Sequence, residues 1–301
     1  VLGMALASTE LKKAISHFTL DLMRPTIRSA WPMALINIAG VFSLNIDILM
    51  LGWWRSVEEV GFYSAAQRLV QILFTLPVIF GISIFPSLSK MVAQNKEKIR
   101  VLIEKSFTAS FLVAIPIALG GVVLARPLIV WLYGAEYSPA TVVLRILVGL
   151  IIVNFSNTII GGIVFAHDQQ KKIVGLVALG SISNIVFNTL LILPFGIAGA
   201  ALATVGSQSI SLWFIWRLVK KRIVMFSVLP SLKRIAVGAV LMSGVSLFLN
   251  QIGIHVLINI AVSALVYFAL LYLLRERILV EFVGVLKRFW SVTPSSQEPK
   301  Q

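Results

Sequence analysis

The sequence predicts an all-α integral membrane protein with about eight transmembrane helices. Of its 301 residues, 58% are hydrophobic and only 13% are charged, and the mean hydropathy is +0.94. A soluble domain typically carries about 25% charged residues. The apolar runs are long and continuous, without the two-residue alternation of a transmembrane β-barrel. The spans are therefore expected to be helices.

Eight segments are long and apolar enough to cross a bilayer, which takes about 20 residues in a helix. They cover residues 30–52, 62–92, 107–125, 140–166, 173–194, 196–218, 234–250 and 253–274. The connections between them alternate in charge. One set of connections carries 22 of the 26 Lys and Arg residues, whereas the other set carries only Arg55 and Arg126. By the positive-inside rule, the charged side and both termini are predicted to be cytoplasmic.

The spans suggest four regions. They are a cytoplasmic amphipathic connector at 1–29, a six-helix core at 30–222, two peripheral transmembrane helices at 223–275, and a cytoplasmic amphipathic helix with a polar tail at 276–301. Leu11, Ile15 and Phe18 recur at helical spacing in the connector, as in a helix that lies at the membrane interface. Because the chain starts with Val, we expect it to be a fragment that lacks its own N-terminal part.

Several kinds of chemistry are disfavoured. Cysteine is absent, and the three histidines do not cluster, so thiol catalysis, zinc-cysteine sites and cofactors are not expected. The chain has a net charge of +14, and most of its Lys and Arg residues lie in the connections between spans. This position argues against nucleic acid as a partner. A membrane-embedded polymerase or glycosyltransferase would need a large soluble loop with catalytic or metal-binding carboxylates. No such loop is present, so we do not expect an enzyme.

Polar residues fall on one face of several spans, at helical spacing. The candidates for binding are Arg68, Gln71, Gln67, Asp47, Asn37, Asn154, Asn157, Asn184, Asn188 and Gln208, with Arg145 as a weaker one. Polar groups within a bilayer face other helices or a water-filled cavity. Small polar residues can also serve only to let helices pack closely. The last two spans are almost purely apolar, so we expect a wet core with two peripheral, lipid-facing helices.

Arg68 is the least ordinary of these residues. A guanidinium is always charged, and it costs about 3 kcal/mol or more if it faces lipid near the bilayer centre. Asp47 is the only acidic residue deep in a predicted span. An Asp47–Arg68 ion pair and a cavity-facing Arg68 both remain open. Arg145 lies near the outer end of its span and is expected to extend to the interface.

Four stretches, in this order and spacing, resemble one family. They are Ser29–Leu69, Leu76–Met91, Leu132–Leu147 and Gly196–Gln208. They resemble Wzx-type polysaccharide flippases of the multidrug/oligosaccharidyl-lipid/polysaccharide superfamily, and the resemblance covers about residues 29 to 275. It implies two six-helix lobes that face a central cavity. This chain would then be the second lobe plus two extra helices, without the first lobe.

The resemblance also implies a function and a site. The stretch YSAAQRL, Tyr63–Leu69, is similar to a YADRL-like stretch of lipid II flippases. The arginine of that stretch is implicated in diphosphate binding and corresponds to Arg68, whereas Gln67 stands where those proteins have Asp. The expected function is flipping of a polyprenyl-diphosphate-linked oligosaccharide across the cell membrane by alternating access. Its expected partners are this substrate, membrane lipids, the missing lobe, and H⁺, Na⁺ or the membrane potential as driving force.

Two related functions stay open as alternatives: a lipid II flippase, and a cation-coupled multidrug antiporter of the same superfamily. For an antiporter we would expect more acidic residues in the spans than Asp47 alone. A polysaccharide polymerase is the alternative from another class.

Overall fold

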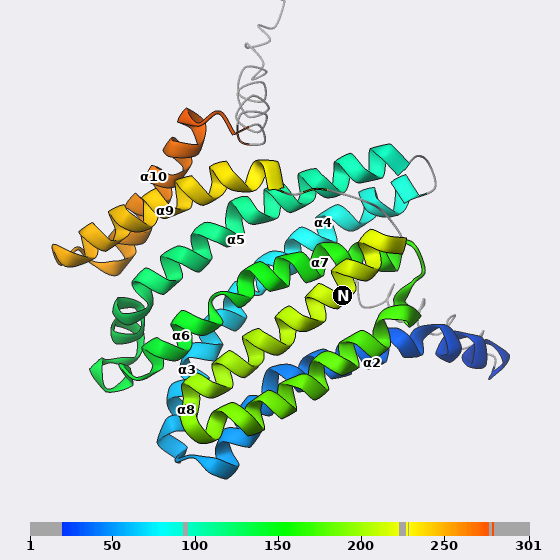
Figure 1. Ribbon diagram of the computed structural model, residues 1–301, viewed down its shortest axis with the longest axis horizontal. Coiled ribbons are helices and arrows are strands. Elements are labelled where there is room, and N and C mark those ends of the chain that lie inside the picture. Colours follow the sequence, from blue (N-terminus) through cyan, green and yellow to red (C-terminus); the bar gives the residue numbers. More distant parts are fainter. Residues whose placement is uncertain (1–19, 93–95, 223–226, 228, 277–278, 280–301) are drawn as a thin grey trace, which may run out of the picture.

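The computed structural model describes residues 20–92, 96–222, 227, 229–276 and 279. All regular secondary structure in this part of the chain is helical, which confirms the all-α class. The helices form a tilted bundle (Figure 1). They are α2 Leu20–Trp54, α3 Val57–Leu73, α4 Thr75–Val92, α5 Lys96–Tyr133, the 3₁₀ helix η1 Ala135–Tyr137, α6 Ala140–Leu147, α7 Leu150–Ala166, α8 Gln170–Arg222, α9 Leu229–Gln251 and α10 Val256–Leu273.

Seven helical stretches in the described residues are long and apolar enough to span a membrane. The sequence predicts eight, and α8 explains the difference because it contains two predicted spans. Gly196 interrupts α8 with φ 57° and ψ −135°, a conformation that glycine adopts without a steric penalty. The Ser211 hydroxyl donates to the Leu176 carbonyl at 3.4 Å, so the segments on either side of Gly196 run antiparallel. We call residues 170–195 the first arm of α8 and residues 197–222 its second arm.

Two predicted spans are each divided into two helices. The span at 62–92 is broken at Phe74, between α3 and α4. Pro77, in the first turn of α4, has no N–H to donate to the Leu73 carbonyl, which favours a break at this point. The span at 140–166 is broken at Val148 and Gly149, between α6 and α7.

The described helices also extend past the predicted span ends. α5 continues to Tyr133, and α2 begins at Leu20, so residues 20–29 of the predicted connector continue directly into the first span. The rest of that connector lies outside the described residues. So do the second amphipathic helix and the polar tail, apart from Glu276 and Leu279.

Two apolar clusters hold the bundle together. The first, which includes Phe107, Ile163 and Tyr267, joins α4, α5, α7 and α8 to α9 and α10. The second, which includes Ile129 and Leu147, joins α2 and α3 to α5, α6, α7 and α8. In Figure 1, α9 and α10 flank α5 at one edge, and α2 lies beside α8 at the opposite edge. Of the polar residues that the sequence singles out, α2 and α8 contain Asn37, Asp47, Asn184, Asn188 and Gln208.

Candidate functional site

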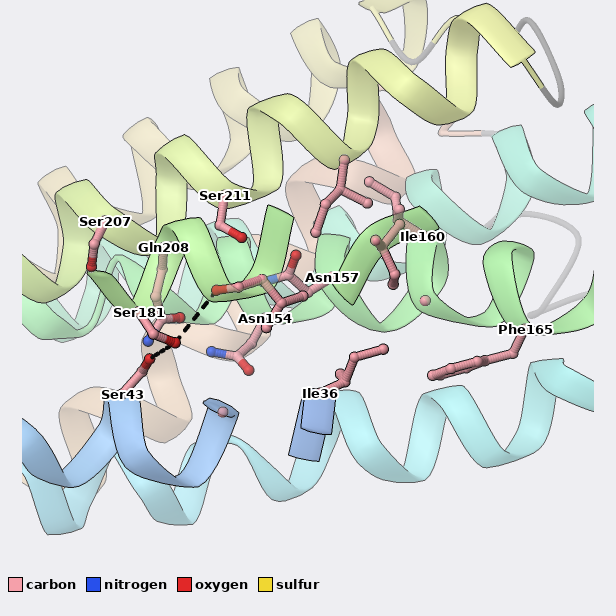
Figure 2. Close-up of a pocket in the computed structure, with 16 residues that line it drawn as sticks. Ile36, Ser43, Asn154, Asn157, Ile160, Phe165, Ser181, Ser207, Gln208 and Ser211 are labelled. Atoms are coloured by element: carbon pink, nitrogen blue, oxygen red, sulfur yellow. Dashed lines mark hydrogen bonds between the residues drawn. The ribbon is translucent and has the colours of Figure 1, made fainter. Parts of the chain in front are cut away.

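A cavity of about 300 Å³ lies between α2, α7 and the two arms of α8 (Figure 2). Its polar lining consists of Ser43, Asn154, Asn157, Ser181, Ser207, Gln208 and Ser211. Its apolar lining consists of Ile36, Ile160, Phe165, Ile173, Val177 and Ile215. The described residues that line it include no charged side chain. The cavity is thus uncharged among these residues, with hydroxyl and amide groups suited to hydrogen bonding set in a lining that is mostly apolar.

Helical spacing and small residues place these groups. Asn154, Asn157 and Phe165 recur at intervals that put them on one face of α7. The arms of α8 approach closely at Gly180, where an added Cβ would come within 2.8 Å of the Ser211 Cβ. The hydroxyls of Ser43 and Ser181 share a hydrogen bond of 2.8 Å, which joins α2 to the first arm (Figure 2).

A buried polar network adjoins this cavity. The Asp47 carboxylate has no exposed surface, and it accepts hydrogen bonds from the Tyr63 hydroxyl at 2.7 Å and the Asn188 amide at 2.6 Å. The Thr204 hydroxyl donates to the same carboxylate. We call Asp47, Tyr63, Asn184, Asn188 and Thr204 the Asp47 network. It joins α2, α3 and both arms of α8.

Asn184 connects the Asp47 network to the cavity. Its amide donates to the Ser207 hydroxyl at 3.2 Å, and Ser207 lines the cavity. Its carbonyl oxygen accepts from the Asn188 amide at 3.2 Å. A change at Asp47 therefore reaches the cavity wall through three hydrogen bonds between side chains: Asp47–Asn188, Asn188–Asn184 and Asn184–Ser207.

The Asp47 network has the features of a small cation site. The ion pairs found among the described residues do not involve Asp47. The Asn188 Oδ1 atom is buried and has no hydrogen-bond partner. Burying a charge or a polar atom without a partner is costly, and hard cations prefer oxygen ligands. The Asp47 carboxylate, the Thr204 hydroxyl and Asn188 Oδ1 could supply such ligands. No group of three or more His, Cys, Asp or Glu side chains suited to a metal occurs in the described part of the chain.

The residues predicted from the sequence separate into three groups. Asn154, Asn157 and Gln208 line the cavity. Asp47, Asn184 and Asn188 belong to the buried network. The remaining five residues do not line the cavity: Arg68 on α3 and Arg145 on α6 are exposed, Gln67 is buried, Gln71 is half-buried, and the exposed Asn37 donates to the Met33 carbonyl of its own helix.

Arg68 does not pair with Asp47 in the described structure. Tyr63 points toward Asp47, and Arg68 follows it by five residues on α3. Five residues turn an α-helix by about 140°, so the two side chains leave α3 in different directions. The sequence left two possibilities open, an Asp47–Arg68 ion pair and a cavity-facing Arg68. The described structure does not form the ion pair.

Sequence reasoning missed Tyr63 and Ser181. Tyr63 lies in an apolar run, where an aromatic residue usually belongs to the core, and nothing in the spacing links it to Asp47. Ser181 follows Gly180 on the first arm of α8, and a small residue beside glycine is typical of helix packing. Only the arrangement of the helices shows that these two hydroxyls take part in the polar region.

Known proteins show similarity over most of the chain. Residues 1–142 match the family model described as polysaccharide biosynthesis protein. A relative from Haloferax volcanii, named probable low-salt glycan biosynthesis flippase Agl15, is 28% identical over 205 residues. That match covers 65% of this chain and 43% of the relative, so the chain spans less than half of that protein's length.

Two solved structures share the fold at 17% sequence identity. The lipid II flippase MurJ in an inward closed conformation has a TM-score of 0.72, over 87% of this chain and 57% of that one. An outward-facing multidrug transporter of the MATE family has a TM-score of 0.60, over 85% of this chain and 66% of that one. In its sequence the chain is thus similar to a polysaccharide biosynthesis family over residues 1–142 and to a probable glycan biosynthesis flippase, and it shares the fold of the lipid II flippase MurJ.

Proposed function

We propose that this chain forms one lobe of a transporter that flips a polyprenyl-diphosphate-linked oligosaccharide across the cytoplasmic membrane. The observation that supports this most directly is the cavity lined by hydroxyl and amide groups of α2, α7 and α8. Sugars present many hydroxyls, and serine, asparagine and glutamine side chains both donate and accept hydrogen bonds. The name of the Haloferax volcanii relative, a glycan biosynthesis flippase, supports the same class of substrate.

A second lobe would complete the substrate site. The cavity of about 300 Å³ is at the lower end of the range for small-molecule sites, roughly 300–1,000 Å³. We therefore propose that it holds part of the headgroup and that a first lobe, as the family resemblance implies, supplies the opposite wall. Transport would follow from one lobe rocking against the other, as in other transporters built from two repeats.

Arg68 is proposed to bind the diphosphate. It is exposed on α3, although it lies within a helical stretch apolar enough to span the membrane. A guanidinium can form two parallel hydrogen bonds with a phosphate, and such charge-assisted bonds are stronger than neutral ones. An exposed position on this lobe leaves Arg68 accessible to a ligand held between two lobes.

The Asp47 network is proposed to bind the cation that drives transport. A buried carboxylate is costly unless it binds a proton or another cation, and the unpartnered Asn188 Oδ1 is a further oxygen that a cation could use. The hydrogen bonds through Asn184 to Ser207 would link cation binding to the cavity wall.

A lipid II flippase and a multidrug antiporter share this fold, and both remain alternatives. The seven hydroxyl and amide side chains in the lining are the feature that supports a glycan headgroup, whereas its apolar part would also suit a drug. A polymerase is less favoured, because the described residues that line the cavity include no carboxylate for catalysis.

Replacement of Arg68 tests the proposed function. In cells that make the complete protein, Arg68→Ala should slow export of the lipid-linked oligosaccharide by about 10- to 100-fold, the loss expected for charge-assisted hydrogen bonds. Arg68→Lys should retain part of the activity because it keeps the charge. Export is measured by surface glycan labelling at matched protein levels in the membrane.

Arg126→Ala is the matched control. Arg126 is, like Arg68, an exposed arginine outside the cavity lining, but it lies on α5 and not on α3. Export should be normal in this variant. Normal export by Arg68→Ala, at a protein level equal to that of the wild type, would rule out the proposed role of Arg68.

A further inference from the structure

A second hollow, of about 480 Å³, lies between the two arms of α8 at their Lys- and Arg-rich end. It is lined by Lys172 of the first arm and by Phe214, Arg217, Leu218 and Lys221 of the second. We call it the basic hollow. Of the described residues that line it, three are cationic and none is a carboxylate. It shares no lining residue with the cavity described above.

The basic hollow opens on a different side of the α8 hairpin from the cavity. Phe214, Arg217 and Lys221 are spaced to lie on one face of the second arm. The cavity residues Ser211 and Ile215 of the same arm lie on a face about 90° away, at 100° per residue. The basic hollow is therefore not part of the sugar-binding cavity.

Membrane topology explains why cations lie at this end of α8, but it does not explain why three of them converge without a counter-ion. Two arginines on the predicted cytoplasmic side do have carboxylate partners: Arg100 pairs with Glu104, and Arg234 pairs with Glu276. The ion pairs found among the described residues include none for Lys172, Arg217 or Lys221. Like charges placed together repel, and a bound anion would offset that repulsion.

An aromatic ring helps to position one of these cations. The Arg217 guanidinium lies 5.3 Å from the ring centre of Trp213. Such a cation–π contact is typical of a guanidinium held in place at an aromatic surface. Tryptophan is also enriched at the level of lipid headgroups, where its ring is partly apolar and partly polar. Trp213 therefore fits a site at the membrane surface.

An apolar stripe continues from the basic hollow along the first arm. Leu179, Val186 and Leu190 follow Lys172 at spacings that keep them on its face of the helix. Their exposed fractions are 40%, 47% and 63%. A small anion such as free phosphate would make no contact with this stripe, whereas an acyl chain could lie along it. The basic hollow and the stripe thus provide positions for a lipid headgroup and for its acyl chain.

We propose that the basic hollow binds the phosphate headgroup of an anionic bilayer lipid, with an acyl chain along the stripe of Leu179, Val186 and Leu190. Basic pockets between transmembrane helices on the cytoplasmic side suit such headgroups. A polyprenyl diphosphate has the same phosphate chemistry and is the competing source. The proposal does not depend on the transported substrate, because the basic hollow lies outside the cavity.

The test is native mass spectrometry of the purified complete protein, titrated separately with phosphatidylglycerol, phosphatidylcholine, a polyprenyl diphosphate and inorganic phosphate. The wild type should bind phosphatidylglycerol more tightly than phosphatidylcholine. The combined variant Lys172→Gln, Arg217→Gln and Lys221→Gln should lose about tenfold or more of the phosphatidylglycerol affinity, since each cation near the headgroup contributes. The single variant Arg217→Gln should show a smaller loss of phosphatidylglycerol affinity. It replaces the triple variant in the test if the triple variant does not fold.

The matched control combines Lys90→Gln, Lys98→Gln and Lys233→Gln. These three exposed cations lie on the same predicted side of the membrane but outside the basic hollow. The control should bind phosphatidylglycerol as the wild type does. An equal loss in both triple variants would overturn the proposal, because it would show a general charge effect. No preference of the wild type for phosphatidylglycerol, or a loss confined to the polyprenyl diphosphate, would also overturn it.

Discussion

At the scale of single residues, Asp47 shows how a buried charge acquires a defined environment. Its carboxylate accepts from three side chains on two other helices and has no exposed surface. Hydrogen bonds alone do not neutralise a buried charge, and removing a charge from water costs several kcal/mol. The unpartnered Asn188 Oδ1 nearby is a further unsatisfied group. The cation proposed above would offset the cost of both features.

The proposed cation site predicts sodium-dependent stability. Because a ligand that binds only the folded state stabilises it by mass action, about 2.7 kcal/mol at 100 times the Kd, the midpoint of thermal unfolding should rise with Na⁺. Asp47→Asn should abolish the rise, and Thr204→Val should weaken it. The measurement compares NaCl with choline chloride at constant ionic strength, on protein purified in detergent.

Asp168→Asn is the control, since Asp168 is an exposed carboxylate outside the network. This variant should keep the full response to sodium. If the wild type and Asp47→Asn respond equally to Na⁺, the site is not at Asp47.

At the scale of elements, α9 and α10 are attached to the core by polar contacts as well as apolar ones. The Tyr267 hydroxyl on α10 donates to the Leu112 carbonyl on α5 at 2.9 Å. That carbonyl lacks its usual partner within the helix, because the residue four positions later is Pro116, which has no N–H. Ser246, Asn259 and Ser263 form a second buried group between α9 and α10. Although α9 and α10 are almost purely apolar in sequence, their few polar residues thus make specific contacts.

Loss of the Tyr267 hydroxyl should weaken the attachment of α10. Tyr267→Phe leaves the Leu112 carbonyl without a donor and is expected to cost about 1 kcal/mol of unfolding free energy. Tyr272→Phe should cost much less, because Tyr272 is exposed on the same helix. Unfolding in detergent and denaturant, followed by circular dichroism, measures both.

A second substitution makes the cause specific. Pro116→Ala restores an N–H that can bond the Leu112 carbonyl, so Tyr267→Phe should cost less in that background, as a double-mutant cycle would show. If Tyr267→Phe costs the same unfolding free energy with and without Pro116→Ala, the Tyr267 hydroxyl does not replace the N–H that Pro116 lacks.

At the scale of the whole molecule, charge is distributed unevenly between the two sets of connections in the sequence. Of the 26 Lys and Arg residues, 22 belong to one set of connections. We expect the two arms of the α8 hairpin to cross the membrane separately, which gives an even number of spans. Eight crossings would place both termini on the same side, and the positive-inside rule predicts that this side is cytoplasmic.

Labelling of single cysteines tests this orientation, and the chain suits it because it contains no cysteine. Ser138→Cys lies between η1 and α6, on the predicted outer side, and should react with a membrane-impermeant maleimide in intact cells. Ser227→Cys lies before α9 on the opposite side and should react only after permeabilisation. Both serines are exposed. The reverse pattern would invert the orientation, and labelling of both in intact cells would contradict the number of spans.

The fold class and the span positions could be predicted because they depend on composition and local periodicity. Apolar runs of about 20 residues must be helical in lipid, and the division near Gly196 is visible as two adjacent runs. The break at Phe74 lies close to Pro77, a residue whose missing N–H marks a bending point in the sequence. The break at Val148 was not predicted, because an apolar run shows its length but not a local change of helix direction. Of the polar residues, helical spacing identified which ones share a face.

The sequence by itself determined that this chain is helical, membrane-embedded and polar along particular helix faces, since these properties follow from nearest neighbours along the chain. Only the tertiary structure decided which polar faces meet. Asp47 lies 141 residues from Asn188 and 157 from Thr204, so their contacts depend on how α2 packs against α8. The same packing placed Asn154, Asn157 and Gln208 around a cavity and left Arg68 exposed. The spacing of residues along one helix does not specify which helix packs against them. The packing of the whole bundle does.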